Sequence, residues 1–260
     1  MVQIDDAAAA LMREHAEGRR FHSLREAFPF DDIATAYAIQ DRFVRTLRTR
    51  DGAGVAGYKI GLTSSRMQAM CGIPHPIAGV VLEGRVHPSG ATLPLSGFGR
   101  LGIEFEVAVR IGRPLGPDSG ISGLADLAEA VAAVAPAVEL IDDRGADYTS
   151  LDMLSLVADN SWNAGIVLGA FRETWPDLAA IEGTAEQAGA VMDRGHGRDA
   201  MGHPFEPLLW LCRHLWSRGE GLKAGDVVMT GSLMPTRFPA AGESYRFTLA
   251  GLGAVDVAFT

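Results

Sequence analysis

The first 50 residues of the chain carry hydrophobic positions at helical spacing. An alanine-rich segment from Asp6 to Glu17 predicts a first helix. A second helix is expected after Asp31 or Asp32, either of which can cap its N-terminus. The residues expected to form one stripe along it are Ile33, Ala36, Tyr37, Gln40, Phe43, Val44 and Leu47. A one-sided stripe indicates that this pair of helices lies against another layer of the protein.

The pattern changes after the glycine-rich stretch from Asp51 to Gly57, where short apolar runs separated by Gly, Pro and Ser are typical of strands. We expect strands near residues 58–62, 79–82, 101–111, 136–141, 163–169, 226–231, 244–250 and 253–259, and helices near 65–71, 122–134, 150–158 and 205–218. Because strands and helices do not alternate regularly, the pattern predicts an α+β fold with a mostly β, mixed architecture. The expected organisation is an N-terminal helical segment, residues 1–50, followed by a β-rich domain, residues 51–260.

Length, composition and charge narrow the class of protein. A chain of 260 residues with 47% hydrophobic and 21% charged positions is ordinary for a compact globular protein. The formal net charge of −9, with no run of basic residues, argues against a nucleic-acid partner. An anionic small substrate stays compatible, because a bound metal reverses the sign of the field inside one pocket.

The cysteines and the N-terminus predict a cytoplasmic location. Cys71 and Cys212 form no CxxC pair and are expected to be free, reduced thiols. Asp5 and Asp6 stand where a secretory signal would carry positive charge. No apolar run approaches the length of about 18 residues that a membrane-spanning helix requires. We therefore expect no membrane partner.

A glycine motif at the boundary does not predict a dinucleotide site. Gly52, Gly54 and Gly57 match GxGxxG, but that site requires a strand before the glycines and a helix after them. Here a predicted helix precedes the motif and a strand-like segment follows it. The chemistry is therefore expected elsewhere in the chain.

Two glutamates share one face of a predicted strand. In the segment from Leu101 to Ile111, apolar residues alternate with Glu104 and Glu106. Side chains two positions apart in a strand lie roughly 7 Å from each other on the same side, close enough to bind one hard cation. The alternative is an acidic, solvent-facing strand surface without a ligand.

Glu139 strengthens the metal hypothesis because it interrupts a short apolar run from Pro136 to Ile141. A buried carboxylate is costly unless it is paired, hydrogen-bonded or coordinated. Three glutamates on neighbouring strands would supply the oxygen ligands that Mg²⁺ or Mn²⁺ prefers. A salt bridge from Glu139 to one of the arginines is the alternative.

Lys59 is unusual in this composition. Only two of the 23 basic residues are lysines, Lys59 and Lys223. The pKa of an ammonium group changes with burial far more readily than that of a guanidinium group, so Lys59 is a candidate acid, base or counter-charge. The alternative is a lysine that extends from a strand edge to solvent.

Further polar residues stand at predicted strand ends. Asp159, Asn160 and Ser161 precede one strand, and a later strand ends at Ser232. Such residues could offer donors to a substrate or could form an ordinary cap and turn. His75 lies in a loop and is the histidine whose role is most open.

At this point the motifs resemble a known family, the 2-keto-4-pentenoate hydratase and 4-oxalocrotonate decarboxylase group of the fumarylacetoacetate hydrolase superfamily. The matching stretches follow the family's order: Gly57–Thr63, Ile103–Val107, Val138–Asp142, Val157–Ser161 and Gly225–Leu233. The resemblance implies a mixed, mostly β roll behind an N-terminal helical segment, usually in a homo-oligomer. It also implies a small 2-oxo acid substrate from the breakdown of aromatic or steroid rings.

The resemblance also assigns roles to individual residues. It makes Glu104, Glu106 and Glu139 ligands of Mg²⁺ or Mn²⁺, and Lys59 the catalytic lysine. It places five residues at the substrate: Leu62 through its backbone amide, Asp159, Ser161, Thr230 and Ser232.

One position departs from the hydratase pattern. Hydratases of this group tend to carry an acid–base Asp where this chain has Ile77, in the stretch from Gly72 to Gly79. The decarboxylases resemble this chain in having an apolar residue there. Either His75, or Lys59 with a water molecule, would then move protons, or the reaction needs fewer proton transfers.

Three functions therefore stay open. The first is a metal-dependent hydratase that adds water to a 2-hydroxy-2,4-dienoate and gives a 4-hydroxy-2-oxo acid. The second is a decarboxylase of a 2-oxo-3-enedioate, with a hydrolase or tautomerase of acylpyruvate-like compounds as a further variant. The third, of another class, is a non-catalytic, metal-stabilised partner subunit.

Overall fold

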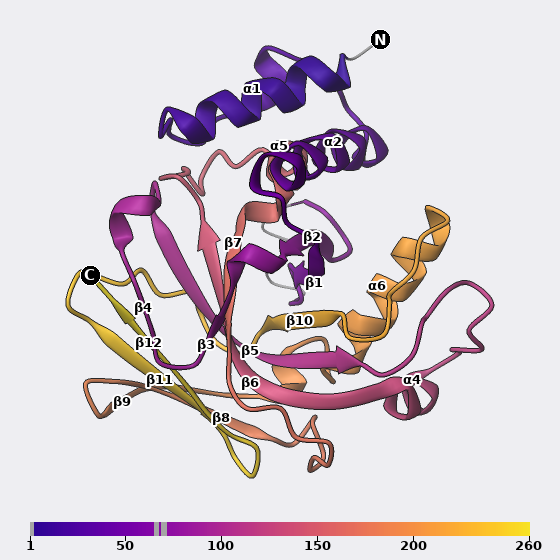
Figure 1. Cartoon of the computed structure of the whole chain (residues 1–260), viewed down its shortest axis with the longest axis vertical. Helices are drawn as coiled ribbons and strands as arrows, with labels where there is room; N and C mark the ends of the chain where they lie inside the picture. Colours follow the sequence, from indigo (N-terminus) through magenta and orange to yellow (C-terminus); the bar gives the residue numbers. More distant parts are fainter. Residues whose placement is uncertain (1–2, 65–67, 69–71) are drawn as a thin grey trace.

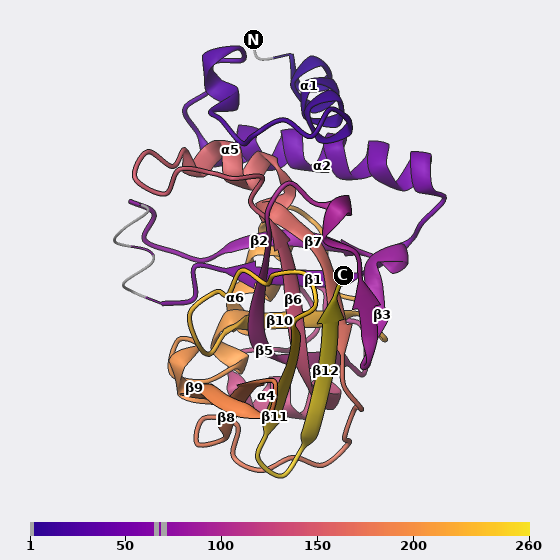
Figure 2. The same ribbon diagram turned by 90° about the vertical axis from the view of Figure 1, so that its left-hand side faces the viewer.

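A computed structural model describes residues 3–64, 68 and 72–260. Three helices lie together at one end of the molecule: α1 (Ile4–Ala16), α2 (Ile33–Asp51) and α5 (Met153–Ala158) (Figure 1). Asp32 caps α2 by accepting a 2.8 Å hydrogen bond from the Thr35 amide. The predicted stripe of α2 is buried, from Ala36 to Leu47. The helices cover the edge of the β structure that is formed by β2 and β7 (Figure 2).

Two mixed sheets form the rest of the protein. The seven-stranded sheet has the order β2-β1-β10-β5-β6-β7-β3. Its strands are β1 (Val55–Gly61), β2 (Ile77–Leu82), β3 (Val86–Pro88), β5 (Leu101–Ile111), β6 (Val131–Asp142), β7 (Asn163–Leu168) and β10 (Val227–Ser232). The β1–β10 and β3–β7 pairs are parallel, and the other pairs are antiparallel.

The second sheet has five strands in the order β4-β12-β11-β8-β9. They are β4 (Ala91–Leu93), β8 (Glu182–Gln187), β9 (Ala190–His196), β11 (Ser244–Leu249) and β12 (Gly253–Phe259). Two further helices are α4 (Leu124–Ala130) and α6 (Phe205–Ser217). Short 3₁₀ turns are η1 (Leu24–Glu26), η2 (Glu83–Arg85), η3 (Leu95–Gly97), η4 (Asn160–Trp162) and η5 (Gly197–Asp199).

The alternation along β5 separates two interiors. Phe105 faces the five-stranded sheet, where its ring lies 5.4 Å from that of Phe247 and 6.5 Å from that of Tyr245. The residues that alternate with Phe105 along β5, such as Glu106 and Ala108, face the inside of the curled seven-stranded sheet. A separate apolar cluster fills this inner space: Val81, Ala108, Ala137, Ile166, Val227 and Met229. One face of β5 therefore builds the main core, and the other faces this smaller apolar cluster.

Side chains complete the outer edge of β2. The side-chain amide of Asn160 accepts from the Val80 amide at 2.7 Å and donates to the Val80 carbonyl at 2.9 Å. The Ala78 amide donates to the Tyr37 hydroxyl at 3.0 Å, and the Ala78 carbonyl accepts from Gln40 and from Ser161. These bonds replace the strand partner that β2 lacks on this side, and they connect it to α2 and to the turn before β7.

The structure corrects the predicted helix at 122–134. The helix α4 ends at Ala130, and β6 begins at Val131, five residues before the predicted strand. Pairing with β5 extends from Val131 opposite Ile111 to Asp142 opposite Leu101. This tertiary pairing outweighs the helical preference of the alanine-rich sequence.

Other predictions vary in outcome. The remaining predicted strands and the helix near 205–218 are confirmed to within three residues at each end, and the helix near 150–158 begins only at Met153. The four strands β3, β4, β8 and β9 were not expected.

The helix predicted near 65–71 falls, except for Gln68, outside the described residues, as does Cys71. Cys212 is buried and free. In the described ranges, no helix has the length and apolarity to cross a membrane.

Candidate metal centre

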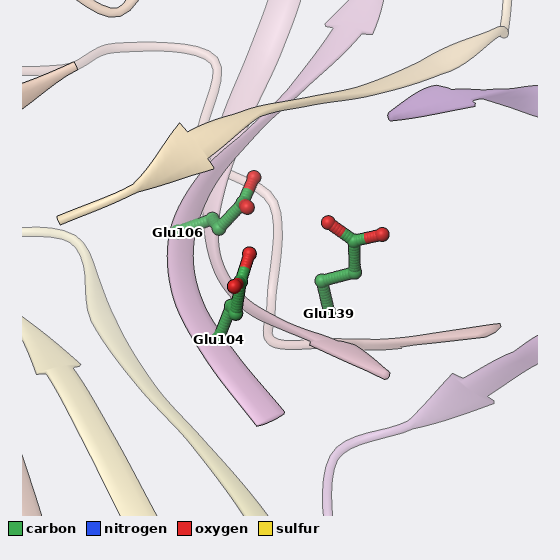
Figure 3. A group of neighbouring side chains, drawn as sticks. All are labelled: Glu104, Glu106 and Glu139. Carbon is green, nitrogen blue, oxygen red and sulfur yellow. The ribbon is translucent and has the colours of Figure 1, made fainter. Parts of the chain in front are cut away.

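The strand register places three glutamates on one face of the curled sheet. Glu104 on β5 lies directly opposite Glu139 on β6. Glu106, two residues along β5, lies opposite Ala137 on one side and Ser232 on the other. Because directly opposed residues share a face, all three carboxylates lie on the inner face of the curled sheet. Figure 3 shows them converging from the two adjacent strands.

The three carboxylates are close and mostly buried. One oxygen atom from each lies within 4.8 Å of the corresponding atoms of the other two. Glu106 and Glu139 have no solvent exposure, and Glu104 is partly exposed. The group therefore lies on the same face of the sheet as the apolar cluster that includes Ala108 and Ala137.

Each glutamate has one oxygen held by a neighbouring donor. The Thr236 hydroxyl donates to Glu104 Oε1 at 2.5 Å. The Gly231 amide donates to Glu106 Oε2 at 2.8 Å, and the Asn163 side-chain amide donates to Glu139 Oε1 at 3.2 Å. Glu106 Oε1 and Glu139 Oε2 are buried and accept no hydrogen bond from the residues that the structure describes.

Lys59 is the nearby cation. Its Nζ atom lies 3.1 Å from Glu139 Oε1, and its side chain is 5% exposed. Lys59 lies opposite Met229 on β10, and Met229 lies opposite Ala108 on β5, so its side chain shares the face of the glutamates. The structure therefore brings together Lys59 and the three glutamates that the sequence singled out.

The pKa values show that burial disfavours the charged forms of the buried glutamates. Burial raises the pKa of Glu106 well above its usual range, and the charges of Glu139 and Glu104 raise it further. Burial also raises the pKa of Glu139, against the opposing effect of Lys59. Burial alone would lower the pKa of Lys59, but Glu139 and Glu104 outweigh it and raise that pKa above the usual value. Lys59 thus offsets only part of the charge of three carboxylates.

These residues fit a divalent cation. Two buried carboxylate oxygens lack a hydrogen-bond partner among the described residues, which is costly in apolar surroundings, and one oxygen of each glutamate lies within 4.8 Å of the others. Three carboxylates supply the hard oxygen donors that Mg²⁺, Mn²⁺ or Ca²⁺ takes, and leave other coordination positions open. The arrangement can therefore hold a metal beside a lysine.

Irregular backbone positions shape the site. The register of β10 shifts between Met229 and Ser232, and this bulge turns the Gly231 amide toward Glu106. Gly231 has φ +104°, and a Cβ there would lie 2.2 Å from the Thr63 hydroxyl, so only glycine fits. Asn160, Ser161 and Trp162 all have positive φ, between 49° and 59°. Such strain persists only where surrounding contacts impose it, here the bonds of Asn160 and Ser161 to β2.

The fold and the site agree with a family relationship. Residues 73–259 match the family model described as Fumarylacetoacetate (FAA) hydrolase C-terminal. The chain belongs to the fumarylacetoacetate hydrolase family. The resemblance inferred from the motifs and the predicted α+β fold class are thereby confirmed.

Relatives in the fumarylacetoacetate hydrolase family match along nearly the whole chain. A 2-keto-4-pentenoate hydratase of Burkholderia vietnamiensis is 35% identical over 261 residues, 99% of this chain and 97% of the relative. A 4-oxalocrotonate decarboxylase of Pseudomonas putida is 31% identical over 256 residues, 95% of each chain. The structure of 4-oxalocrotonate decarboxylase from Pseudomonas putida G7, complexed with magnesium and adipate, matches with a TM-score of 0.90 at 29% identity, covering 99% of this chain and 97% of that one.

Within this family fold, the hydroxyl groups predicted at the substrate bond to the backbone. Thr230 is fully buried and donates to the Val107 carbonyl at 2.9 Å. Ser232 donates to the Met234 carbonyl, and Ser161 donates to the Ala78 carbonyl. Leu62 follows β1 directly and has φ 57°, a strained conformation for a leucine. These contacts show structural roles for the three hydroxyl groups and leave contact with a substrate a proposal.

Asp159 and His75 are not part of the glutamate group. Asp159 is buried, and its two oxygens lie 2.6 Å from His15 Nε2 and 2.6 Å from Arg144 Nη2. His75 lines a hollow of about 640 Å³ between α2 and α6, where its ring stacks on Trp210. The structure thus gives each residue a partner outside the metal centre.

Ile77, in contrast, lies beside Lys59. It stands opposite Gly61 on β1, while Lys59 stands opposite Gly79 on β2, so all four positions share one face. A Cβ built at Gly61 would lie 3.4 Å from Ile77 Cγ1 and 3.5 Å from Lys59 Nζ. Ile77 is 2% exposed. The departure from the hydratase pattern therefore falls next to the catalytic candidate.

Two residues that contact the glutamates, Thr236 and Asn163, were not predicted from the sequence. Thr236 is 132 positions from Glu104, and Asn163 is 24 positions from Glu139. Asn163 lies two residues after the polar cluster that ends at Ser161, and that cluster was predicted as a cap or a set of substrate donors. Such long-range contacts between side chains follow from the curl of the sheet, not from a local pattern.

Proposed function

We propose that this protein is a divalent-metal-dependent lyase acting on a small 2-oxo acid. The reaction we favour is that of a hydratase, which adds water to a 2-hydroxy-2,4-dienoate of the 2-keto-4-pentenoate type and yields a 4-hydroxy-2-oxo acid. The observation that carries the proposal is the convergence of Glu104, Glu106 and Glu139 within 4.8 Å, with Lys59 3.1 Å from Glu139. The 35% identity to a hydratase over the full length supports the choice of reaction.

Glu104, Glu106 and Glu139 are the proposed ligands of Mg²⁺ or Mn²⁺. When bound, the cation would act as a Lewis acid toward the carboxylate and 2-oxo oxygens of the substrate. All three ligands are carboxylates, which favours a hard metal over zinc or copper. The complex of the decarboxylase from Pseudomonas putida G7 with magnesium supports the same class of ion.

Lys59 is the proposed catalytic residue. Hydration requires a proton at C5 of the dienoate and then water at C4, and the Lys59 ammonium group offers donors beside the glutamates. Its buried positive charge would also stabilise negative charge that develops on the substrate oxygens. The neighbouring apolar cluster, which includes Ile166 and Met229, offers no hydrogen-bonding group to bulk water on that side.

Decarboxylation of a 2-oxo-3-enedioate of the 4-oxalocrotonate type is the second candidate. Ile77 favours it, because an aliphatic side chain beside Lys59 cannot transfer a proton. An apolar neighbour also disfavours a charged carboxylate and so favours the loss of CO₂. The fold match to a decarboxylase, with a TM-score of 0.90, supports this reading.

Substrate contacts and assembly complete the proposal. Leu62, Ser161, Thr230 and Ser232 are proposed to border the substrate, with Asp159 contributing only through its ion pairs. The chain is proposed to form a homo-oligomer, which light scattering of the purified protein would test.

Ultraviolet absorbance with two substrates tests the function. The substrates are 2-hydroxypenta-2,4-dienoate and 2-oxohex-3-enedioate, each with Mg²⁺-loaded and with metal-stripped protein. Metal-dependent loss of the dienoate, with 4-hydroxy-2-oxopentanoate as product, is the expected result. Loss of the enedioate alone, with release of CO₂, would establish the decarboxylase. Turnover that survives complete removal of metal would contradict both reactions as proposed, and tight metal binding without turnover of either compound would favour a non-catalytic subunit.

A further inference from the structure

Each of the three glutamates has one carboxylate oxygen held by a neighbouring donor, and this contact indicates a role for residues outside the metal group. A carboxylate rotates easily about its last side-chain bond, so a free glutamate presents either oxygen in many directions. A hydrogen bond to one oxygen restricts this rotation and thereby sets the direction of the other. In this protein each glutamate has such a bond, from Thr236, Gly231 or Asn163.

We propose that Thr236 and Asn163 are positioning residues that orient Glu104 and Glu139 toward the metal. Thr236 holds Glu104 Oε1, and Asn163 holds Glu139 Oε1, which leaves the second oxygen of each carboxylate for coordination. Glu139 Oε2 is buried and has no hydrogen-bond partner in the described part of the chain, as expected of an atom that binds a cation. The inference rests on the proposed metal site.

Both donors are themselves held in place. Thr236 precedes Arg237, whose amide and carbonyl pair with Ile103 on β5 at 3.0 and 2.7 Å. This pairing fixes the loop after β10 beside Glu104. Asn163 begins β7 and follows the strained turn that Asn160 bonds to β2. The positions of the two donors are thus determined by backbone pairing on opposite sides of the site.

Removal of the two donors is expected to affect their glutamates differently. Glu139 Oε1 also contacts Lys59 at 3.1 Å, so it keeps one partner when Asn163 is removed. Thr236 is the donor that the described contacts give to Glu104, which is also the more exposed carboxylate. Loss of an outer contact to a metal ligand typically lowers metal affinity by about 10–100-fold. We expect the Thr236 hydroxyl to matter more than the Asn163 amide.

The experiment measures Mn²⁺ affinity directly, from the electron paramagnetic resonance signal of free Mn²⁺, without substrate or turnover. Thr236→Val is expected to raise the dissociation constant by about 10–100-fold, and Asn163→Ala by a smaller factor near the lower end of that range. Thr236→Ser keeps a hydroxyl group and is expected to restore most of the affinity. Thr248→Val on β11, in the other sheet, is the matched control and is expected to bind as the wild type does.

The outcomes separate this inference from the proposed function. Wild-type protein that binds no Mn²⁺ would contradict the metal site itself. Wild-type binding together with unchanged affinity in both Thr236→Val and Asn163→Ala would overturn the positioning role and leave the metal site intact. Equal losses in Thr236→Val and Thr236→Ser would also overturn it, because the hydroxyl would then not be the operative group. If Thr236→Val does not fold, as judged by circular dichroism, Asn163→Ala and Thr236→Ser carry the test.

Discussion

Lys59 Nζ lies 3.1 Å from Glu139 Oε1, although two strands, β10 and β5, separate β1 from β6. In a flat sheet these positions would be about 14 Å apart, at three strand spacings. The contact forms because the sheet curls with this face inward, so that the long lysine side chain reaches Glu139 on β6. The site is thus a product of sheet curvature, and the ion pair connects strands that are not neighbours.

The first prediction concerns Lys59→Met, which removes the ammonium group and keeps most of the side-chain volume. We expect turnover to fall by about 10²–10⁴-fold, the range typical of a lost proton donor, while Mn²⁺ affinity is retained. Affinity is retained because no ligand oxygen is removed and a positive charge beside Glu139 is lost. Steady-state kinetics and Mn²⁺ titration check the two halves. Normal turnover in this variant would reduce Lys59 to a structural residue.

The second prediction concerns metal removal. Without a cation, Glu104, Glu106 and Glu139 repel one another in a mostly buried site, with Lys59 as the partial offset. Chelation is therefore expected to lower the melting temperature, and Mg²⁺ or Mn²⁺ to raise it in a concentration-dependent way. Glu106→Gln removes one buried charge and is expected to abolish this metal-dependent rise. Thermal unfolding with and without chelator measures both effects, and a melting temperature indifferent to metal in the wild type would contradict the site.

The same residues show how far the sequence alone predicts this site. The alternation along β5 placed Glu104 and Glu106 on one face, and the apolar surroundings of Glu139 marked a buried carboxylate; both are local patterns. Lys59 stood out through composition. The contacts of Thr236 and Asn163 with the glutamates have no local signal, because they depend on how a seven-stranded sheet curls.

The fold shows the same division between local and long-range information. Strand β5 was predicted at its observed bounds, since its alternation is clear. Residues 131–134 were predicted as helix because alanine favours that state, and pairing with β5 decided otherwise. The hairpin of β8 and β9 was not anticipated, because its strands are polar and its turn, at Ala188 and Gly189, is marked only by a single glycine. The Asn160 bonds that complete the edge of β2 also have no sequence signature.

The third prediction tests Asp159 as a structural residue. Asp159→Asn removes the carboxylate 2.6 Å from the buried Arg144 and leaves it with the more distant Glu14, which is expected to cost about 3–5 kcal/mol of stability at neutral pH. Burial alone would raise the pKa of Asp159, but His15 and Arg144 outweigh it and lower that pKa below the usual value. The folded-state pKa is thus below the unfolded-state one, so the stabilisation is present above the unfolded value of about 3.9 and is lost as pH falls through the folded one.

The measurement is urea unfolding of wild type and Asp159→Asn at neutral pH and at pH values below about 4. The difference between the two proteins is expected to be large at neutral pH and to shrink in acid. Glu14 also faces Arg144, at 3.6 Å, and is present in both proteins. Asp256→Asn, in an exposed pair with Arg246, is the control and should cost no more than about 1 kcal/mol. A neutral-pH difference as small as that of the control would contradict the structural role.

The last prediction uses Ile77 to decide between the two lyase reactions. Ile77→Asp places a carboxyl group next to Lys59, where hydratases of this group tend to carry one, while Ile77→Val keeps the position apolar and controls for the change in volume. If the apolar side chain favours decarboxylation, Ile77→Asp is expected to lower turnover of 2-oxohex-3-enedioate and to raise hydration of 2-hydroxypenta-2,4-dienoate, because the new group can transfer a proton and adds charge where a carboxylate must be lost. Ile77→Val is expected to keep the wild-type preference. The ratio of kcat/KM for the two substrates is the quantity to compare, since a general loss of folded protein lowers both values and leaves the ratio unchanged. A ratio that is the same in all three proteins would show that position 77 does not determine the reaction, and the proton donor would then have to be sought at Lys59 itself.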